Sequence, residues 1–147
     1  LKYTELNSLY EGDHQSFKKV SPINLKKNYK LYLCLKEFAR QHLLNSCQDI
    51  SEGGLMTALY EATDIFSFDI KISTDPLMQL FNEGPGQMLV SIDKEDQKTF
   101  EASLEKNSLG FKFLGNVTKG QFARIETREE AIQLDLVKLR AAYQGGL

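Results

Sequence analysis

The sequence predicts an α+β domain in which helices pack on a mostly antiparallel sheet. Three observations lead to this fold class. Segments with helical spacing alternate with strand-like segments, several strand-like segments carry polar residues at every second position, and 41% of the residues are hydrophobic. Antiparallel sheets commonly leave one face to solvent, which explains the polar positions. The length of 147 residues is that of one typical domain.

The first long helix is predicted from Ser21 and Pro22 to about Leu44. Serine is a favoured N-cap, and proline is favoured at the first helical position. The apolar residues Leu31, Cys34, Leu35 and Phe38 lie three or four positions apart, as on one helix face. Residues 1–20 are interpreted as a lead-in with one short helical turn around Leu6, Leu9 and Tyr10, and residues 21–147 as the domain itself.

A short strand at 44–49 and a helix from Gly53 to about Ala62 follow. The segment 66–73 has the strict alternation of a half-buried strand. Its inward-facing residues are predicted to be Phe66, Phe68, Ile70 and Ile72. Its outward-facing residues are predicted to be Ser67, Asp69, Lys71 and Ser73.

The next elements are predicted from their start signals. Pro76 opens a short helical turn, residues 82–86 form a loop, and residues 87–92 form a strand. Asp93 is expected to cap a helix through about Asn107, with Phe100 and Leu104 four positions apart on its apolar face.

The C-terminal third predicts a hairpin and a last helix. The stretches GFKFLGNV and QFARIE flank TKG, which favours an antiparallel hairpin. TREE at 127–130 matches a capping box, but Ile132 and Leu134 alternate as in a strand. We favour the second alternative: a strand at 131–134, then a helix from Leu136 to about Tyr143 capped by Asp135.

Composition and charge exclude several classes of function. A net charge of −2 with scattered basic residues gives no footprint for nucleic acid. No apolar run is long enough to span a membrane, and the first residues, LKYTELNSLYEGD, do not form a signal peptide. Cys34 and Cys47 are too few for a disulfide framework and are expected to be buried thiols in the cytoplasm. Because the chain begins with Leu1, it is expected to be a piece of a longer protein or a processed product.

The stretch SCQDISEGGLMTAL, residues 46–59, carries the chemistry. Gly53 and Gly54 would let an anion approach the unpaired N–H groups at the start of a helix. Asp49 could hold Mg²⁺ through oxygen, and Ser51 is placed to cap the helix. The motif is neither a Walker loop nor a dinucleotide-binding fingerprint. On spacing alone, a capped tight turn without a ligand is the favoured interpretation.

The same stretch resembles the helix-opening motif of C-terminal domains in the AIR synthase-related superfamily, Ser-Ala-His-Asp-Ile-Ser-Asp-Gly-Gly-Leu. Among its members, the chain looks most like the phosphoribosylformylglycinamidine synthase family. LFNEGPGQMLVSI, FLGNVTKGQFARI and DLVKLRAAYQGGL are similar to three later segments of that family, and SPINLKKNYKLYLCLKEFARQHLLNSC to its lead-in and helix. Gln48 and Gln87 stand where that family usually has His and Arg, which removes two potential phosphate contacts. Tyr143 replaces a Trp, and Glu52 replaces an Asp.

The resemblance implies a fragment of an ATP-dependent ligase of purine biosynthesis. Such an enzyme makes formylglycinamidine ribonucleotide from formylglycinamide ribonucleotide, using ATP, Mg²⁺ and glutamine-derived ammonia. It implies as partners an N-terminal-type AIR synthase domain of the same parent chain and a glutaminase domain or subunit. The ending of the chain resembles that of the last C-terminal-type domain, and the domain pair it belongs to is expected to be largely structural or to hold an auxiliary nucleotide. The isolated fragment is expected to be non-catalytic and to self-associate.

The same resemblance implies the candidate site residues. They are Ser51, Gly53, Gly54, Glu83, Gly84 and Gly86 for phosphate or nucleotide, and Asp49 for the metal. No catalytic residue is assigned, and an ordinary tight turn at 83–86 is the alternative to a ligand loop. Another ATP-dependent enzyme of the superfamily and a non-catalytic interaction module remain as alternative functions.

Overall fold

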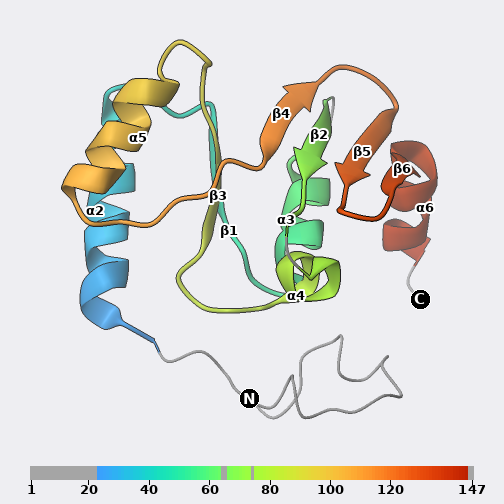
Figure 1. The fold of residues 1–147 in the computed structure, drawn as a ribbon, viewed down its shortest axis with the longest axis horizontal. Coiled ribbons are helices and arrows are strands. Elements are labelled where there is room, and N and C mark those ends of the chain that lie inside the picture. The colour runs from blue at the N-terminus through green and yellow to red at the C-terminus, as the bar shows by residue number, and fades with distance from the viewer. Residues whose placement is uncertain (1–22, 64–65, 74, 146–147) are drawn as a thin grey trace. The chain divides into compact units, whose positions relative to one another are not determined.

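The computed structural model describes residues 23–63, 66–73 and 75–145, which form two compact units (Figure 1). Of the described residues, 23–52 and 83–112 form unit 1, and 53–63, 66–73, 75–82 and 113–145 form unit 2. The helical turn predicted around Leu6 and the helix start predicted at Ser21 lie outside the described residues. The mixture of helices and sheets confirms the predicted α+β class.

The first helix of unit 1, α2 (Leu25–Arg40), is shorter than predicted. Its N-cap is Asn24, whose side-chain oxygen accepts a hydrogen bond from Lys27 N at 3.0 Å. The helix ends at Arg40 instead of Leu44 because His42 adopts a left-handed conformation, φ 56°. Leu43 N then donates to Phe38 O at 3.0 Å, which is a Schellman ending.

The core of unit 1 lies between α2 and α5 (Gln97–Lys106). The predicted apolar spacing is confirmed, since Leu35, Phe38, Phe100 and Leu104 are all buried. The rings of Phe38 and Phe100 stack at 4.7 Å between centroids. Asp93 was predicted wrongly as the helix cap. The N-cap is Asp96, and Asp93 instead accepts a hydrogen bond from the side chain of Asn45 at 2.8 Å.

Two strands complete unit 1. β1 (Ser46–Asp49) pairs antiparallel with β3 (Met88–Ser91) in the register Ser46↔Ser91 to Asp49↔Met88. Met88 and Val90 turn toward the α2–α5 core. Cys47, expected to be buried, is exposed.

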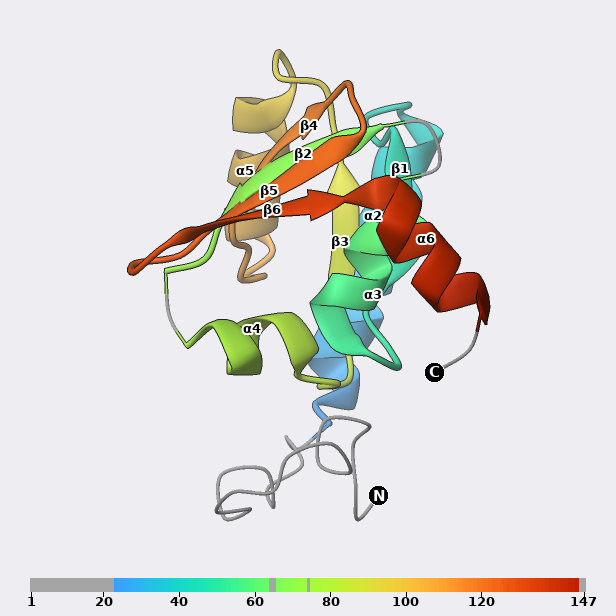
Figure 2. The same ribbon diagram turned by 90° about the vertical axis from the view of Figure 1, so that its right-hand side faces the viewer.

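Unit 2 contains a four-stranded sheet in the order β4-β2-β5-β6. The strands are β2 (Ser67–Lys71), β4 (Gly115–Thr118), β5 (Phe122–Glu126) and β6 (Ala131–Asp135). Figures 1 and 2 show β2 between β4 and β5, antiparallel to the first and parallel to the second. The predicted hairpin of β4 with β5 is therefore wrong. The connection at 119–121 instead crosses the end of β2.

The side chain of Ser67 contributes to this crossing. Ser67 was predicted to face out, but only 1% of its surface is exposed, and its hydroxyl donates to Phe122 O at 2.6 Å. Phe66 was predicted to face in and is instead 40% exposed, because the strand begins only after it. Phe68, Ile70 and Ile72 are buried as predicted. Alternation therefore holds within the strand and fails at its first residues.

The favoured alternative at the C-terminus is confirmed. β6 pairs with β5, and α6 (Leu136–Gly145) follows at once. The Asp135 carboxylate accepts hydrogen bonds from Val137 N and Lys138 N at 3.0 and 3.3 Å, so it caps the helix. The Thr127 hydroxyl accepts from Glu129 N and Glu130 N, so TREE forms the hairpin turn between β5 and β6.

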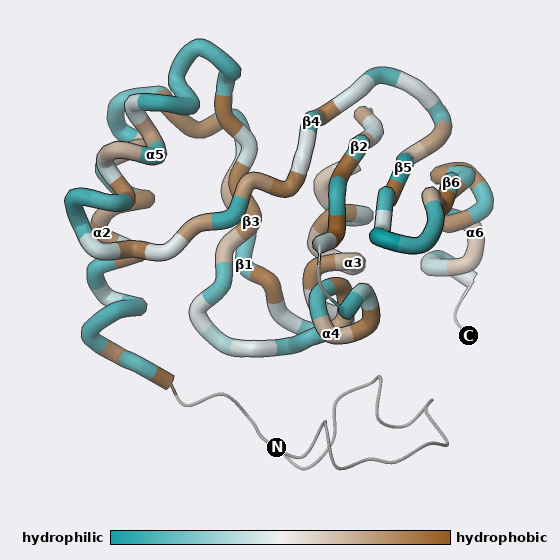
Figure 3. Tube along the Cα trace, in the orientation of Figure 1, coloured by the Kyte–Doolittle hydropathy of each residue, from teal (hydrophilic) through white to brown (hydrophobic). Residues whose placement is uncertain are grey.

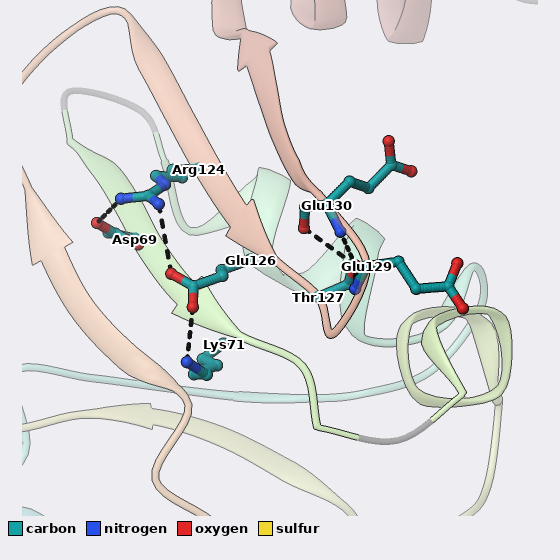
Figure 4. Close-up of polar contacts among 7 residues, drawn as sticks. All are labelled: Asp69, Lys71, Arg124, Glu126, Thr127, Glu129 and Glu130. Atoms are coloured by element: carbon teal, nitrogen blue, oxygen red, sulfur yellow. Dashed lines mark hydrogen bonds and ion pairs between the residues drawn. The ribbon is translucent and has the colours of Figure 1, made fainter.

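The polar face of the sheet carries a ladder of charged side chains (Figure 4). Lys71 on β2 contacts Glu126 on β5 at 2.6 Å, and Arg124 contacts both Glu126 and Asp69 at 3.3 and 3.9 Å. The Lys71 ammonium lowers the pKa of the Glu126 carboxyl, first by a hydrogen bond and then by its charge. Ion pairs this exposed are screened by solvent, so each contributes little to stability.

Two helices of unit 2 meet at a glycine. α3 (Gly54–Glu61) contacts α4 (Pro76–Phe81), and Asp75 caps α4 through Leu77 N and Met78 N. Gly54 has φ +68°, and a Cβ there would lie 2.7 Å from Leu80 O. Because both the backbone conformation and the contact exclude a side chain, Gly54 fixes where α3 begins against α4.

We expect Gly54→Ala to lower the free energy of unfolding by about 1–3 kcal/mol, because alanine is strained at this φ and collides with α4. Urea unfolding of the purified chain measures the change. Gly110→Ala is the matched control, since a Cβ there meets nothing within 4 Å. Equal effects of the two substitutions would contradict the proposed packing role.

We expect Glu126→Gln to reduce the loss of stability on acidification. The pKa of Glu126 is lower in the folded chain than its ordinary value of 4.5. Its carboxylate therefore stabilises the fold above that value, and this contribution disappears as the pH falls through the lower, folded-state pKa. Unfolding curves between about pH 6 and pH 3 measure the effect. Glu129→Gln, which removes an exposed carboxylate at the same hairpin, should leave the slope unchanged; if both variants behave alike, the ladder does not hold Glu126.

Candidate functional site

The pairing of β1 with β3 brings two of the predicted segments together in unit 1. Asp49 lies opposite Met88, and Ile50 N donates to Gln87 O at 3.1 Å just beyond the ladder. Asp49 and Ser51 are exposed. The acidic end of β1 and the chain leaving the 83–86 loop are therefore neighbours, as the resemblance implied.

The 83–86 loop is closely packed. Glu83 is half-buried and Gly84 is buried. Gly86 has φ +78°, and it packs against the side chain of Asn28 on α2. The positive φ is the reason that glycine is favoured at 86, whatever ligand the loop binds.

The turn into α3 belongs to unit 2. Gly53 is the N-cap with φ +73°, and no side chain caps the helix. The prediction that Ser51 caps α3 is therefore wrong, because the two consecutive left-handed glycines place the helix start after Gly53. The start of α3 carries the positive end of the helix dipole.

The metal chemistry available to the described residues is limited. Within 23–63, 66–73 and 75–145, no three His, Cys, Asp or Glu residues gather so that they could hold a metal ion. Asp49 can therefore supply one carboxylate, with the other ligands coming from elsewhere. Mg²⁺ commonly binds in this way, through one or two carboxylates, water and substrate phosphates.

Cys47 lies in β1 beside the motif but is a poor nucleophile. Desolvation raises the pKa of its thiol above the ordinary value, which keeps the sulfur protonated at neutral pH.

No membrane-crossing helix, judged by length and apolarity, occurs in the part of the chain that the structure describes.

Sequence reasoning missed a pocket on unit 2. Its volume is about 300 Å³, and it is lined by Tyr60, Glu61, Arg140 and Gln144 of α3 and α6. The Tyr143 hydroxyl donates to Glu61 at 3.0 Å, which raises the pKa of Tyr143, and its ring lies 4.6 Å from that of Tyr60. A second pocket, of about 260 Å³, lies on the β5–β6 hairpin. Neither pocket contains a predicted site residue, and no local motif marks the first, which arises from the packing of α6 on α3.

Comparison with known proteins identifies the family. Residues 4–127 match the family described as AIR synthase related protein, C-terminal domain. The phosphoribosylformylglycinamidine synthase subunit PurL of Carboxydothermus hydrogenoformans is 30% identical over 135 residues, which are 87% of this chain and 18% of that protein. The corresponding subunit of Leuconostoc mesenteroides is 36% identical over 105 residues, 71% of this chain and 14% of that protein. The chain thus spans less than a fifth of the curated relatives it matches.

Solved structures share the fold. The structure of PurLQS from Thermotoga maritima covers 84% of this chain with a TM-score of 0.74 at 15% identity, and the chain covers 23% of it. Thermotoga maritima PurL complexed with ATP covers 75% of this chain with a TM-score of 0.68 at 17% identity, and the chain covers 21% of it. The resemblance drawn from the 46–59 motif is confirmed. The chain belongs to the family of AIR synthase related C-terminal domains.

Proposed function

We propose that this chain is the C-terminal AIR synthase-related domain of a phosphoribosylformylglycinamidine synthase, comprising residues 21–147 of the fragment. The observation that carries the proposal is the family match over residues 4–127, combined with relatives named PurL at 30% and 36% identity. The parent would be a cytoplasmic ligase of purine biosynthesis. Because the chain spans only 14–18% of these relatives, the activity belongs to the parent and not to the fragment.

The reaction requires an activated amide. ATP phosphorylates the amide oxygen of formylglycinamide ribonucleotide, and ammonia then displaces phosphate to leave the amidine. The protein must hold the phosphates and stabilise the charge that develops on them. Thermotoga maritima PurL has been solved as a complex with ATP and as a complex with FGAR, which supports this substrate pair.

In this domain, we assign the phosphate contacts to two places. The start of α3, which follows Gly53, presents the positive end of the helix dipole to an anion. Ser51 and the loop of Glu83, Gly84 and Gly86 border the end of the β1–β3 ladder in unit 1. The space beside Gly54 is filled by α4, so a ligand would reach the helix end and not the glycine Cα.

Asp49 fits Mg²⁺ as a single ligand. Its carboxylate is exposed at the end of β1 and supplies the hard oxygen that Mg²⁺ prefers. The metal, once bound, would neutralise phosphate charge. Asp49 would hold it in place, while phosphates, water or the partner domain complete the coordination.

The parent assembly would supply the missing parts. We propose an N-terminal-type AIR synthase domain in the same chain and a glutaminase domain or subunit that delivers ammonia. The similarity to the structure of PurLQS from Thermotoga maritima supports a parent that works within such an assembly. Without its partner domain, the fragment would be inactive and would self-associate through the surface that the partner normally covers.

The assay of the parent tests this function. We expect the complete gene product, supplied with ATP, Mg²⁺, ammonia and formylglycinamide ribonucleotide, to release phosphate and form the amidine in equal amounts. Residues 1–147 alone should release none, because they lack the partner domain. Phosphate release by the parent without amidine, or with a different superfamily substrate, would refute the synthase assignment.

We expect Asp49→Ala to weaken Mg-ATP binding by the parent about tenfold, because one charge-assisted metal contact is lost. Isothermal titration with Mg-ATP measures the dissociation constant. Glu105→Ala, which removes an exposed carboxylate on α5, is the control and should bind normally. Unchanged binding by the Asp49 variant would remove Asp49 from the site and favour a scaffolding role for this domain.

A further inference from the structure

Helix α2 has two apolar faces, and the described residues bury one of them. The buried face carries Leu35 and Phe38, with Leu31 and Cys34 packed beside them. The second face is exposed, with Leu25 at 76%, Tyr29 at 65%, Tyr32 at 52% and Leu33 at 47% of their surfaces. We call these four residues the α2 stripe.

The α2 stripe is continuous along the helix. Positions 25, 29, 32 and 33 have the i, i+4, i+7, i+8 spacing of one helix face, opposite the face that packs on α5. Figure 3 shows apolar and polar residues alternating along α2. Single exposed apolar residues are ordinary, but a contiguous row of large ones is typical of a protein or membrane interaction site.

Positive charge surrounds the α2 stripe. The same face continues into Lys36 and Arg40, both exposed, and Lys26 and Lys30 lie alongside. The helix carries five basic residues and one acidic residue, although the net charge of the whole chain is −2. Symmetrical pairing of α2 with its copy would bring these like charges together. The complementary surface is therefore apolar in the middle and acidic at the end facing Arg40.

We propose that the α2 stripe docks onto another domain of the parent chain, through an apolar patch bordered by carboxylates. The inference rests on the proposed function, because it takes the chain as part of a longer protein. The amount of parent chain outside the fragment supports this occupant, since the fragment spans only 14–18% of its curated relatives. Tyrosines suit such an interface because one end of the side chain is apolar and the other forms hydrogen bonds.

Radical footprinting of tyrosine tests the proposal in the parent and in residues 1–147. We expect oxidation of Tyr29 and Tyr32 to be about tenfold slower in the parent, because the centre of an interface excludes water. In the isolated chain, the oxidation rate should not depend on protein concentration, because the fragment is expected to self-associate through the surface that the N-terminal-type domain covers and not through the α2 stripe. Equal rates in parent and fragment would overturn the proposal even if the parent makes the amidine, so the failure of the inference is distinguishable from that of the function.

Other occupants give different results. Protection in the isolated chain that grows with concentration would identify a second copy. Protection there that disappears when residues 1–22 are removed would identify the chain's own N-terminal segment. Protection that appears only with vesicles of anionic phospholipid would identify a membrane surface. Each of these outcomes contradicts docking within the parent.

Two neighbouring leucines provide a matched pair of variants. Leu33 belongs to the α2 stripe, whereas Leu35 is 7% exposed in the core. We expect Leu33→Ser to lower the unfolding temperature of the parent while leaving that of residues 1–147 unchanged, and Leu35→Ser to lower both. If Leu33→Ser leaves the parent unchanged as well, the stripe carries no interface.

Discussion

The antiparallel pairing of β1 with β3 is the constraint on which the arrangement of unit 1 and its candidate site depends. The chain leaves unit 1 after Glu52 and returns at Glu83, so the ladder must join strands that are far apart in sequence. Closing a chain segment of this length costs conformational entropy. The β1–β3 ladder and the α2–α5 core must offset that cost. The same closure places Asp49 beside the strand that leaves the 83–86 loop. The site residues of unit 1 therefore meet only when the ladder forms.

Two glycines of the candidate site, Gly54 and Gly86, are explained by packing as well as by ligand binding. Both have positive φ; Gly54 leaves no room for a Cβ against α4, and Gly86 packs against Asn28. A GG pair before a helix is therefore explained by local packing before any ligand is considered. The packing does not account for the exposed carboxylate of Asp49. We propose that this carboxylate serves the metal of the parent enzyme.

Much of the fold could be predicted from local patterns, because the spacing of apolar residues along the sequence indicates which side chains are buried. The spacing of Phe100 and Leu104, the cap at Asp135 and the inward residues of β2 all followed from nearest neighbours in sequence. The hairpin of β4 with β5 failed because alternation does not say which strands are adjacent, and β2 lies between them. Helix α2 begins at Leu25, later than predicted, because Asn24 caps it. The Tyr60–Arg140 pocket could not be predicted, because it depends on how α6 packs on α3. The site residues near the ladder were predicted from a family motif and not from physical reasoning alone.

The central claim is that this chain functions as one domain of a longer synthase. Sequencing the coding DNA on both sides of the region for residues 1–147 tests it most directly. We expect a continuous reading frame that encodes further AIR synthase-related domains, including an N-terminal-type domain. A start codon and a stop codon immediately flanking this region would contradict it, and the domain would then have to act as a free-standing binding module.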